Sequence, residues 1–411
     1  MPHQAKLYEI LAAYQRNRRQ RFTDRDTLEQ WQRRMLLRLY KEILPQSPYY
    51  REYLGTPLDS WPPVSAPALV RDFDQINTLG LQHEEVFARG VRADISRDYS
   101  WFARDYIPLL SAGSKGRRRA FPISHEERLD RIGTILARLY PDDLPPSLSI
   151  ACYYRGNNVP CYELTSAALT LHSYDIQDDP VWLLKKLQHQ QPHIIIAPAS
   201  ILLALLRELM EGRLELPRCE RVYNSGEVMT ARDRLALRRQ FAVVGDIYQG
   251  VEGVLGVTCP HGRLHLAEEK YHLEKEWLDG EHYLPRITAF GTHALPLVRY
   301  RLDDIFSDAP NPCPCGSSTQ AVRGIEGRLD DLFILPTANA IRRSKIYPQA
   351  SHQALARLLP WKDDYRLTQS GKNHIALAAN VPLETLQECR HHLERAWQQH
   401  DVDTAQLQWQ L

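Results

Sequence analysis

From about residue 100, apolar runs alternate with amphipathic segments along the chain. Residues 147–154 (SLSIACYY) and 193–199 (HIIIAPA) are apolar runs bounded by breakers, which predicts buried strands. Apolar residues recur at helical spacing in DPVWLLKKLQHQ and SILLALLRELMEG, which predicts helices. Residues 221–227 (RVYNSGE) lead into a further helix that Thr230 would cap. Strands that alternate with helices predict an α/β fold with a mostly parallel sheet.

Other parts of the chain follow different patterns. Residues 3–45 predict one or two amphipathic helices, and residues 254–308 predict short strands and turns. The last 80 or so residues predict a hairpin, a helix and a final strand, enough for a small α+β domain. Because 411 residues are too many for one simple core, we expect a large N-terminal domain of several subdomains, residues 1–327, and a small C-terminal domain, residues 328–411.

Charge and hydropathy exclude several classes of function. The chain has 51 basic and 50 acidic residues, so we expect no nucleic-acid partner, and we interpret RNRRQR (16–21) as a solvated helix face. No apolar run reaches 18 residues, and the first 25 residues are too polar for a signal peptide. We therefore expect a cytoplasmic protein without a membrane partner. The oligomeric state stays open, a homodimer included.

The stretch SAGSKGRRRAF (111–121) lies between the apolar run YIPLL and a helical pattern, SHEERLDRIGTILARLY. Its glycines permit close backbone approach, and its hydroxyl and N–H groups can bind phosphate oxygens. Its lysine and three arginines add positive charge, and arginine suits bidentate phosphate contacts. Taken alone, the stretch fits both a phosphate-binding loop and a basic surface turn.

Five stretches occur in a set order: SAGSKGRRRAF, YNSGEVMT, DIYQGVEG, LVRYRLDDI and IEGRLDD. In this order they resemble the motifs of the adenylate-forming (acyl/aryl-CoA synthetase) superfamily, in particular the branch of phenylacetate–CoA ligase and the deazaflavin-cofactor synthetase-like proteins. The resemblance runs from roughly residue 45 to the end. It implies attack of a carboxylic acid, which we expect to be aromatic, on the α-phosphate of ATP. Pyrophosphate leaves, and the acyl group passes to coenzyme A or a carrier-protein thiol.

Such chemistry needs an adenine pocket, Mg²⁺ and charge neutralisation on the phosphates. The resemblance implies that Tyr248 stacks on adenine and that Glu252 holds Mg²⁺. Gly226 and Glu227 follow a strand, a position where ligands bind in open sheets. The resemblance implies that they line the rim of the adenine pocket, and a plain strand-to-helix connection is the alternative. The ATP-binding residues implied by these motifs are Ser111, Gly113, Ser114, Gly116, Arg118, Gly226, Glu227, Tyr248, Gln249 and Glu252.

The last two motifs imply the ribose contact and a hinge. Asp304 matches the acid that accepts hydrogen bonds from both ribose hydroxyls, with Asp303 as the fallback one position away. Arg328 matches a nucleotide-contacting arginine, and Asp330 the hinge about which the small domain rotates. A local salt bridge is the alternative for these two residues. The resemblance thus implies Glu252, Asp304 and Arg328 as catalytic residues.

Two positions depart from the resemblance. Relatives carry Thr or Ser where this chain has Val251, and they carry a lysine near the C-terminus, whereas no lysine follows Lys372 here. Two alternative functions stay open. These departures favour a nucleotide-binding homologue without ligase activity, and the resemblance to the deazaflavin-cofactor synthetase-like proteins keeps open the transfer of AMP to a cofactor hydroxyl or phosphate.

The seven cysteines do not predict a secreted disulfide scaffold. Four of them, Cys152, Cys161, Cys219 and Cys389, lie in apolar contexts that predict packed thiols. The remaining three lie in turns with two histidines, in CPHGRLH and CPCG. Three thiolates and one imidazole favour a tetrahedral structural Zn²⁺ site over free thiols. The candidate ligands are Cys259, Cys313, Cys315 and either His265 or His261.

Overall fold

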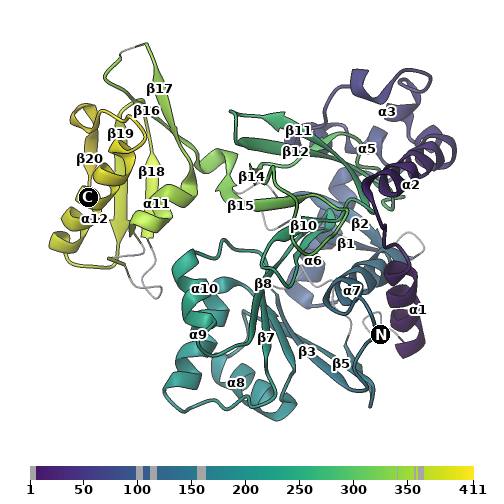
Figure 1. The fold of residues 1–411 in the computed structure, drawn as a ribbon. Coiled ribbons are helices and arrows are strands. Elements are labelled where there is room, and N and C mark those ends of the chain that lie inside the picture. The colour runs from purple at the N-terminus through teal and green to yellow at the C-terminus, as the bar shows by residue number, and fades with distance from the viewer. Residues whose placement is uncertain are drawn as a thin grey trace.

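One large mixed sheet carries most of the fold (Figure 1). The computed structural model describes residues 6–98, 105–111, 118–154, 163–339, 341–355, 358–359 and 365–411. The parallel half of the sheet consists, in spatial order, of β5 (Leu169–Asp175), β3 (Leu148–Tyr154), β6 (Ile194–Ala197), β7 (Arg221–Asn224) and β8 (Val243–Gly250), with β4 (Leu164–Thr165) antiparallel at its edge.

The other half of the sheet is antiparallel and continues directly from β8. Its strands in spatial order are β9 (Gly253–Thr258), β10 (Leu264–Leu266), β15 (Ala321–Arg328), β14 (Asp304–Asp308), β12 (His282–Ala289) and β11 (Tyr271–Trp277), with β13 (Tyr300–Arg301) beside β12. The α/β class is confirmed, but the expectation of a mostly parallel sheet is wrong for this half. No helices separate its strands, so short turns and loops connect them, and such connections favour antiparallel pairing.

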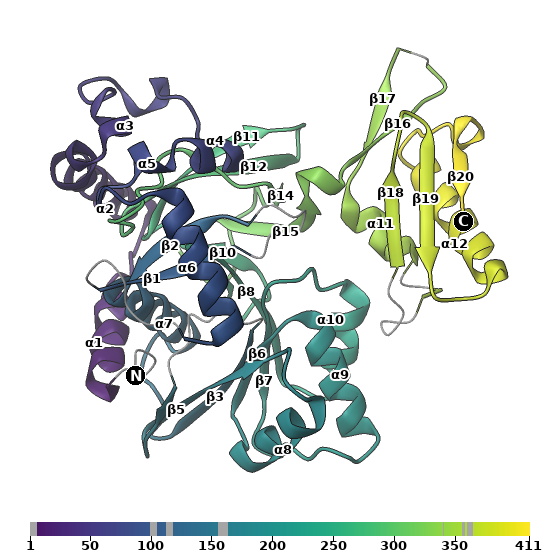
Figure 2. The same ribbon diagram turned by 180° about the vertical axis from the view of Figure 1, so that it is seen from behind.

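Helices cover both faces of the parallel half (Figures 1 and 2). On β3, Ile150, Cys152 and Tyr154 belong to the core under α1 (Leu7–Arg18) and α7 (His125–Leu139). The alternate residues Ala151 and Tyr153 belong to the core under α8 (Pro180–Gln190) and α9 (Ala199–Met210). This period of two buries the strand on both sides, as a parallel sheet requires.

Helix caps follow the sequence prediction where the structure tests it. Thr230 accepts a hydrogen bond from the Asp233 amide at the start of α10 (Ala231–Leu237), which confirms the predicted cap.

Arg18 and Arg21, from the basic run near the N-terminus, form ion pairs with Asp143 and Asp142. These contacts agree with a solvated face paired with local acids.

The N-terminal segments pack around the antiparallel half of the sheet in a core that includes Trp61, Phe73, Leu110 and Tyr300. They are α2 (Arg25–Arg38), a π-helical turn (Leu39–Ile43), 3-10 turns at Leu44–Gln46 and Leu58–Ser60, α3 (Pro48–Arg51), α4 (Ala66–Arg71), α5 (Phe73–Ile76), α6 (His83–Ser96), β1 (Tyr106–Leu110) and β2 (Ala120–Ser124).

The basic stretch at 111–119 connects two strands, not a strand and a helix as its sequence setting suggests. β1 and β2 pair antiparallel with Leu110 opposite Ala120, and α7 begins only after β2. Four of the five β2 side chains are buried, so this short run AFPIS pairs with β1 before Ser124 caps the helix.

The C-terminal segments form a lobe of their own beside β14 and β15 (Figures 1 and 2). The predicted hairpin, helix and final strand are confirmed, and a core around Leu335, Ile375, Leu393 and Trp397 joins them. The elements are a 3-10 turn (Leu329–Asp331), β16 (Phe333–Pro336), β17 (Arg343–Ile346), α11 (Pro348–Leu355), β18 (Tyr365–Gln369), β19 (His374–Ala379), α12 (Leu383–Gln398), a 3-10 turn (Thr404–Gln406) and β20 (Gln408–Gln410).

A small group of contacts joins this lobe to the rest of the chain. The Tyr347 hydroxyl donates to Asp279, and the Tyr347 ring stacks on His282 with centroids 3.9 Å apart. Lys345 Nζ donates to the Leu278 carbonyl at 2.7 Å. These contacts all meet the β11–β12 turn, and they are called the Tyr347 latch below.

Candidate active site at the junction of the sheet

The junction between the two halves of the sheet brings three predicted residues together. Tyr248 lies near the carboxyl end of β8, and its hydroxyl donates to Asp304 Oδ2 at 2.6 Å. Asp304 opens β14 and stands opposite Arg328 of β15 in the register of these strands. Arg328 Nη2 lies 3.7 Å from Asp303 Oδ2, so both acids of the RLDD motif contact the site.

Burial raises the pKa of Asp304, although the hydrogen bond from Tyr248 and the charge of Arg328 lower it. Burial, followed by the charge of Asp304, also raises the pKa of Tyr248. The tyrosine therefore stays a phenol and a hydrogen-bond donor at neutral pH. A buried carboxylate held in this way is suited to accept hydrogen bonds from a diol.

Glu252 lies in the tight turn between β8 and β9, and 7% of its surface is exposed. A Cβ atom on Gly250 would lie 2.4 Å from Glu252 Oε2, and Gly253 has φ +137°. The two glycines of YQGVEG therefore serve the turn that presents this carboxylate. Arg131 holds the turn from α7 by donating to the carbonyls of Gly250 and Val251 at 3.1 and 2.5 Å.

Val251 is buried in the same turn, within the apolar core around β1, β2 and β13. Its side chain contributes packing to that core and offers no hydroxyl to a ligand.

The two ends of the basic loop are fastened to each other. The amide of Ser111 donates to the Arg119 carbonyl at 2.8 Å, and the Arg119 amide donates to Ser111 Oγ at 2.8 Å. Arg118 turns away, since its guanidinium pairs with Asp94 of α6 and donates to the Ser111 carbonyl. Arg119 turns toward the junction, where its Nη2 lies 3.6 Å from Glu252 Oε1. The predictions for Gly113, Ser114 and Gly116 lie outside the described residues.

The NSGE motif lies at the carboxyl ends of β6 and β7. Gly226 has φ +93°, and the Glu227 carboxylate accepts hydrogen bonds from the amide and hydroxyl of Ser200 at 2.8 and 2.9 Å. Gln249 Nε2 donates to Ser225 Oγ at 3.0 Å. Ser225 and Gln249 therefore face each other between β7 and β8, while Glu227 is engaged at the start of α9.

Several buried polar atoms near this junction have no hydrogen-bond partner among the described residues: Tyr153 Oη, Asn224 Oδ1, Arg119 Nε and Arg328 Nε. Leaving a buried polar atom unsatisfied costs about 1–3 kcal/mol. Two of these atoms, Tyr153 Oη and Asn224 Oδ1, belong to residues at the carboxyl ends of the parallel strands β3 and β7, where ligands bind in open sheets. The other two belong to arginines that carry charge near the acidic residues Glu252 and Asp303. The residues present thus fit a nucleotide with its Mg²⁺, through the carboxylates of Glu252 and Asp304 and the nearby arginines.

Two residues of this site, Arg131 and Tyr300, were missed by the sequence reasoning, and a third, Arg119, was counted only among the charged residues of the basic loop. Arg119 was not singled out because the resemblance selected its neighbour Arg118. Burial raises the pKa of Tyr300, and the neighbouring Glu252 carboxylate raises it further. A tyrosine inside the motif LVRYRLDD was the available signal, but its side chain meets Glu252 only through the fold.

The Cys/His cluster lies at a separate place, where β10 meets the loop before β15. The ligand atoms of Cys259, His265, Cys313 and Cys315 all lie within 4.8 Å of one another. Cys259 Sγ is 3.7 Å from Cys313 Sγ, and Cys315 Sγ is 3.3 Å from His265 Nε2. Tetrahedral Zn²⁺ with bonds of about 2.3 Å to sulfur separates two sulfurs by about 3.8 Å. The donor set therefore fits zinc, and His261 is an exposed residue outside it.

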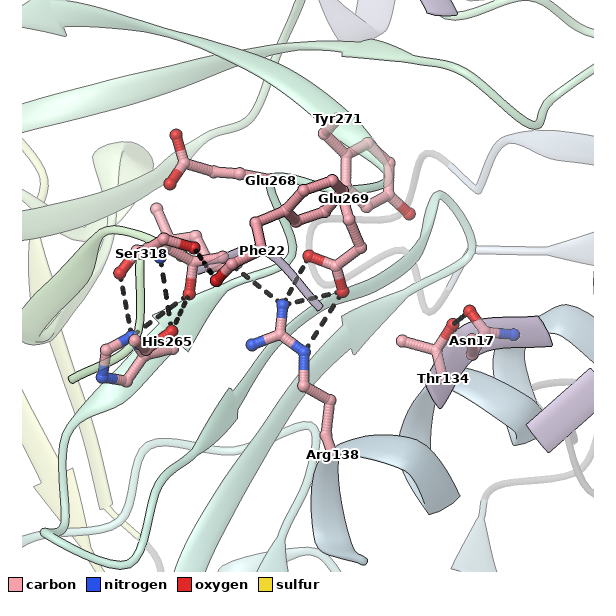
Figure 3. Close-up of polar contacts among 12 residues, drawn as sticks. Asn17, Phe22, Thr134, Arg138, His265, Glu268, Glu269, Tyr271 and Ser318 are labelled. Atoms are coloured by element: carbon pink, nitrogen blue, oxygen red, sulfur yellow. Dashed lines mark hydrogen bonds and ion pairs between the residues drawn. The ribbon is translucent and has the colours of Figure 1, made fainter. Parts of the chain in front are cut away.

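His265 is oriented for such a role by its second nitrogen. Nδ1 lies 2.9 Å from the Thr319 carbonyl, which leaves Nε2 facing Cys315. Figure 3 shows His265 near Ser318. The Ser318 hydroxyl donates to the Phe22 carbonyl at 3.1 Å. The cluster is thereby joined to the segment between α1 and α2.

A cavity of about 410 Å³ adjoins the cluster between α7 and this N-terminal segment. Figure 3 shows its wall, where Arg138 and Glu269 pair at 2.6 Å and Asn17 contacts Thr134. Its arginines Arg18, Arg21 and Arg138 are all paired with acids. The cavity is distinct from the junction of the sheet.

No protein-family model matches the chain, and no curated protein matches it. Solved structures do resemble it. 2-Hydroxyisobutyryl-CoA ligase in its postadenylation state, in complex with 2-HIB-AMP, is 14% identical, with a TM-score of 0.63 over 91% of this chain and 83% of that one. Amide bond synthetase McbA from Marinactinospora thermotolerans is 12% identical, with a TM-score of 0.52 over 76% and 66%.

The anthranilate CoA ligase AuaEII, in complex with anthranoyl-AMP, is 14% identical, with a TM-score of 0.50 over 74% of this chain and 62% of that one. The chain thus has the mixed α/β fold of adenylate-forming ligases over most of its length. Within the described residues, no helix has the length and apolarity that crossing a membrane requires.

Proposed function

We propose that the protein activates a carboxylic acid with ATP as an acyl-adenylate and transfers the acyl group to a thiol of coenzyme A or a carrier protein. The observation that carries the proposal is the arrangement of Tyr248, Asp304 and Glu252 at one junction of a ligase-like sheet. Three functions of an ATP site, base contact, ribose contact and metal binding, then fall to β8, β14 and the turn between β8 and β9.

In this proposal Asp304 accepts hydrogen bonds from the ribose hydroxyls, and Tyr248 keeps that carboxylate in place while it packs on the base. Arg328 neutralises the acidic pair and contacts the nucleotide. Glu252 would hold Mg²⁺, which supplies charge neutralisation on the phosphates. The buried turn that presents Glu252 limits its movement, and this orients the phosphate chain.

The acid is proposed to bind where β3, β6 and β7 end, near Tyr153, Ala197–Ser200 and Tyr223–Ser225. Tyr153 stacks on Tyr174 with centroids 4.6 Å apart, so aromatic surface lies below this region. Ser225 and Gln249 add hydroxyl and amide groups. This mixture supports an aromatic carboxylic acid as the substrate class.

The domain arrangement is part of the proposal. Residues 328–411 would form a mobile C-terminal domain that rotates about Asp330 between acid activation and thiol transfer. Its support is the separate core of the lobe and its latch to β11–β12 through Tyr347. The Cys/His cluster would hold a structural Zn²⁺.

A second candidate function is nucleotide binding without acid activation. Val251 favours it, because a buried apolar side chain adjoins Glu252 at the point where the resemblance implies a hydroxyl. The exposed position of Lys372, in the β18–β19 turn, also favours it, because the chain has no later lysine.

Acid-dependent exchange of pyrophosphate into ATP tests the first proposal. We expect exchange with at least one aryl acid in the presence of Mg²⁺, and we expect Asp304→Ala to abolish it. The matched control Asp308→Ala changes an acid at the far end of the same strand and should leave exchange intact. ATP binding without exchange across a broad acid panel would support the second function instead.

A further inference from the structure

Arg119 differs from the other cations near the junction in how it is held. Its backbone is fixed to Ser111 by two hydrogen bonds of 2.8 Å, one in each direction. Its side chain is 17% exposed and extends from the start of β2 toward Glu252. The pairing of β1 with β2 therefore fixes the backbone of Arg119, and its guanidinium lies in the protein interior.

The surroundings of Arg119 are acidic, yet they leave it incompletely bonded. Its nearest acid contact is Glu252, with Nη2 to Oε1 at 3.6 Å, beyond the range of a hydrogen bond. Its buried Nε has no hydrogen-bond partner among the described residues. Burial lowers the pKa of Arg119, and the groups that together raise it above its usual value are Tyr300, Glu252, Asp303 and Asp304.

Arg328 is held as loosely as Arg119, with Nη2 3.7 Å from Asp303, and it has its own proposed contact with the nucleotide. Other neighbouring cations of the described residues are engaged elsewhere. Arg118 pairs with Asp94, and Arg131 is occupied by the carbonyls of Gly250 and Val251. Lys372 is exposed in the C-terminal lobe. A guanidinium offers five donors in a planar fork, so the loosely bonded Arg119 has donors to give to a ligand.

We propose that Arg119 is a catalytic residue of acid activation, binding two oxygens of the α-phosphate of ATP through its guanidinium. This inference rests on the proposed function. A carboxylate oxygen of the acid forms a bond to the α-phosphorus, the bond from that phosphorus to the bridging oxygen breaks, and pyrophosphate leaves with the electron pair. Arg119 transfers no proton. It stabilises the negative charge on the α-phosphate oxygens from the position just before β2, a task that the resemblance gives to a C-terminal lysine.

The test compares Arg119→Gln, Arg119→Lys and the matched control Lys372→Ala in the full chain. Calorimetry measures the affinity for ATP, AMP and adenosine, and pyrophosphate exchange measures activation. We expect Arg119→Gln to bind ATP and AMP at least tenfold more weakly while adenosine affinity is unchanged. Exchange should fall about 10²–10³-fold, as for loss of one charge-stabilising donor. Lys372→Ala should match the wild type.

Adenosine affinity separates a phosphate contact from damage to the fold. Arg119→Lys keeps a positive charge beside Glu252, so this variant replaces Arg119→Gln in the test if the glutamine variant does not fold. Lysine lacks the planar fork of donors of arginine, so pyrophosphate exchange by Arg119→Lys should fall about tenfold. Unchanged AMP affinity and exchange in these variants would overturn the role of Arg119 while leaving the ligase proposal standing. A wild-type chain that binds no nucleotide would overturn both.

Discussion

The Zn²⁺ proposed for the Cys/His cluster would stabilise the fold by an amount that the structure allows us to estimate. Cys259 and Cys313 lie 54 residues apart in sequence, and an ion between them closes that loop. By the chain-entropy relation for a cross-link, a loop of this size contributes about 4 kcal/mol to stability at 25 °C. The expected N-terminal domain has about 330 residues, each with an unfolding entropy of about 2.1 cal/mol/K. Loss of that stabilisation should therefore lower the Tm by about 6 °C.

The two histidines of CPHGRLH provide a matched pair of variants. His265 is buried in the cluster, whereas His261 is exposed beside it. We expect purified wild-type protein to contain one Zn²⁺ per chain by elemental analysis and to lose about 6 °C in Tm with a zinc chelator. His261→Ala should keep both properties. His265→Ala should start from a lower Tm and show no further response to the chelator.

The chelator response is the informative quantity, because truncation of a buried histidine destabilises the protein by itself. Hydrogen exchange gives a local readout, since loss of the ion should release the Ser318–Phe22 contact and expose amides between α1 and α2. Protein free of zinc with an unaltered Tm in chelator would refute the reasoning. A chelator response retained in His265→Ala would refute the ligand assignment.

Three further changes test the junction and the latch. Burial raises the pKa of Asp304, so ionisation of its carboxyl group costs stability as the pH rises above 3.8. Asp304→Asn should therefore stabilise the free protein at pH 7, and it should abolish adenosine binding. Calorimetry measures both effects. Tyr347→Phe should speed tryptic cleavage after Arg328. Burial raises the pKa of Asp279, but hydrogen bonds, led by that from Tyr347, lower it to about 2, so this variant should raise it in an NMR titration. In the wild type, the stabilisation by the latch is present above pH 3.8 and is lost as pH falls toward 2. Val251→Thr buries a hydroxyl and should cost about 1–3 kcal/mol in denaturant unfolding while increasing pyrophosphate exchange.

Much of the parallel half was predictable because its signals are local. A β-branched run such as HIIIAPA, followed by a helical pattern, defines β6 and α9 without knowledge of their neighbours. The antiparallel half depends in part on pairings between distant segments, such as β10 with β15. The contact of Tyr248 with Asp304 follows from those pairings, and 56 residues separate its partners. Motif order named both residues, but only the fold brings them together.

Which of two neighbouring residues enters a site was the hardest feature to predict. Successive side chains of a strand point to opposite faces, so a shift of one position turns a side chain away from the site. The resemblance selected Arg118 and not Arg119, yet Arg118 contacts α6 and Arg119 contacts Glu252. His265 enters the metal cluster because it lies on β10, paired with Val257 and Ala321, while His261 lies in the turn before that strand. Spacing alone cannot make this distinction, because it does not define the strand register.

One departure from the resemblance, Val251, lies beside Glu252, and the proposed role of Arg119 offsets the other, the missing lysine. Val251 adjoins Glu252 and removes a hydroxyl, while Arg119 faces the same carboxylate and adds a cation. Arg131 holds the turn in place through two backbone carbonyls, which any residue at position 251 would still offer. The geometry of the turn is therefore independent of the side chain that changed. A site built in this way relies on the charge just before β2 for the phosphate, so its activation step should depend more on Arg119 than on closure of the C-terminal lobe.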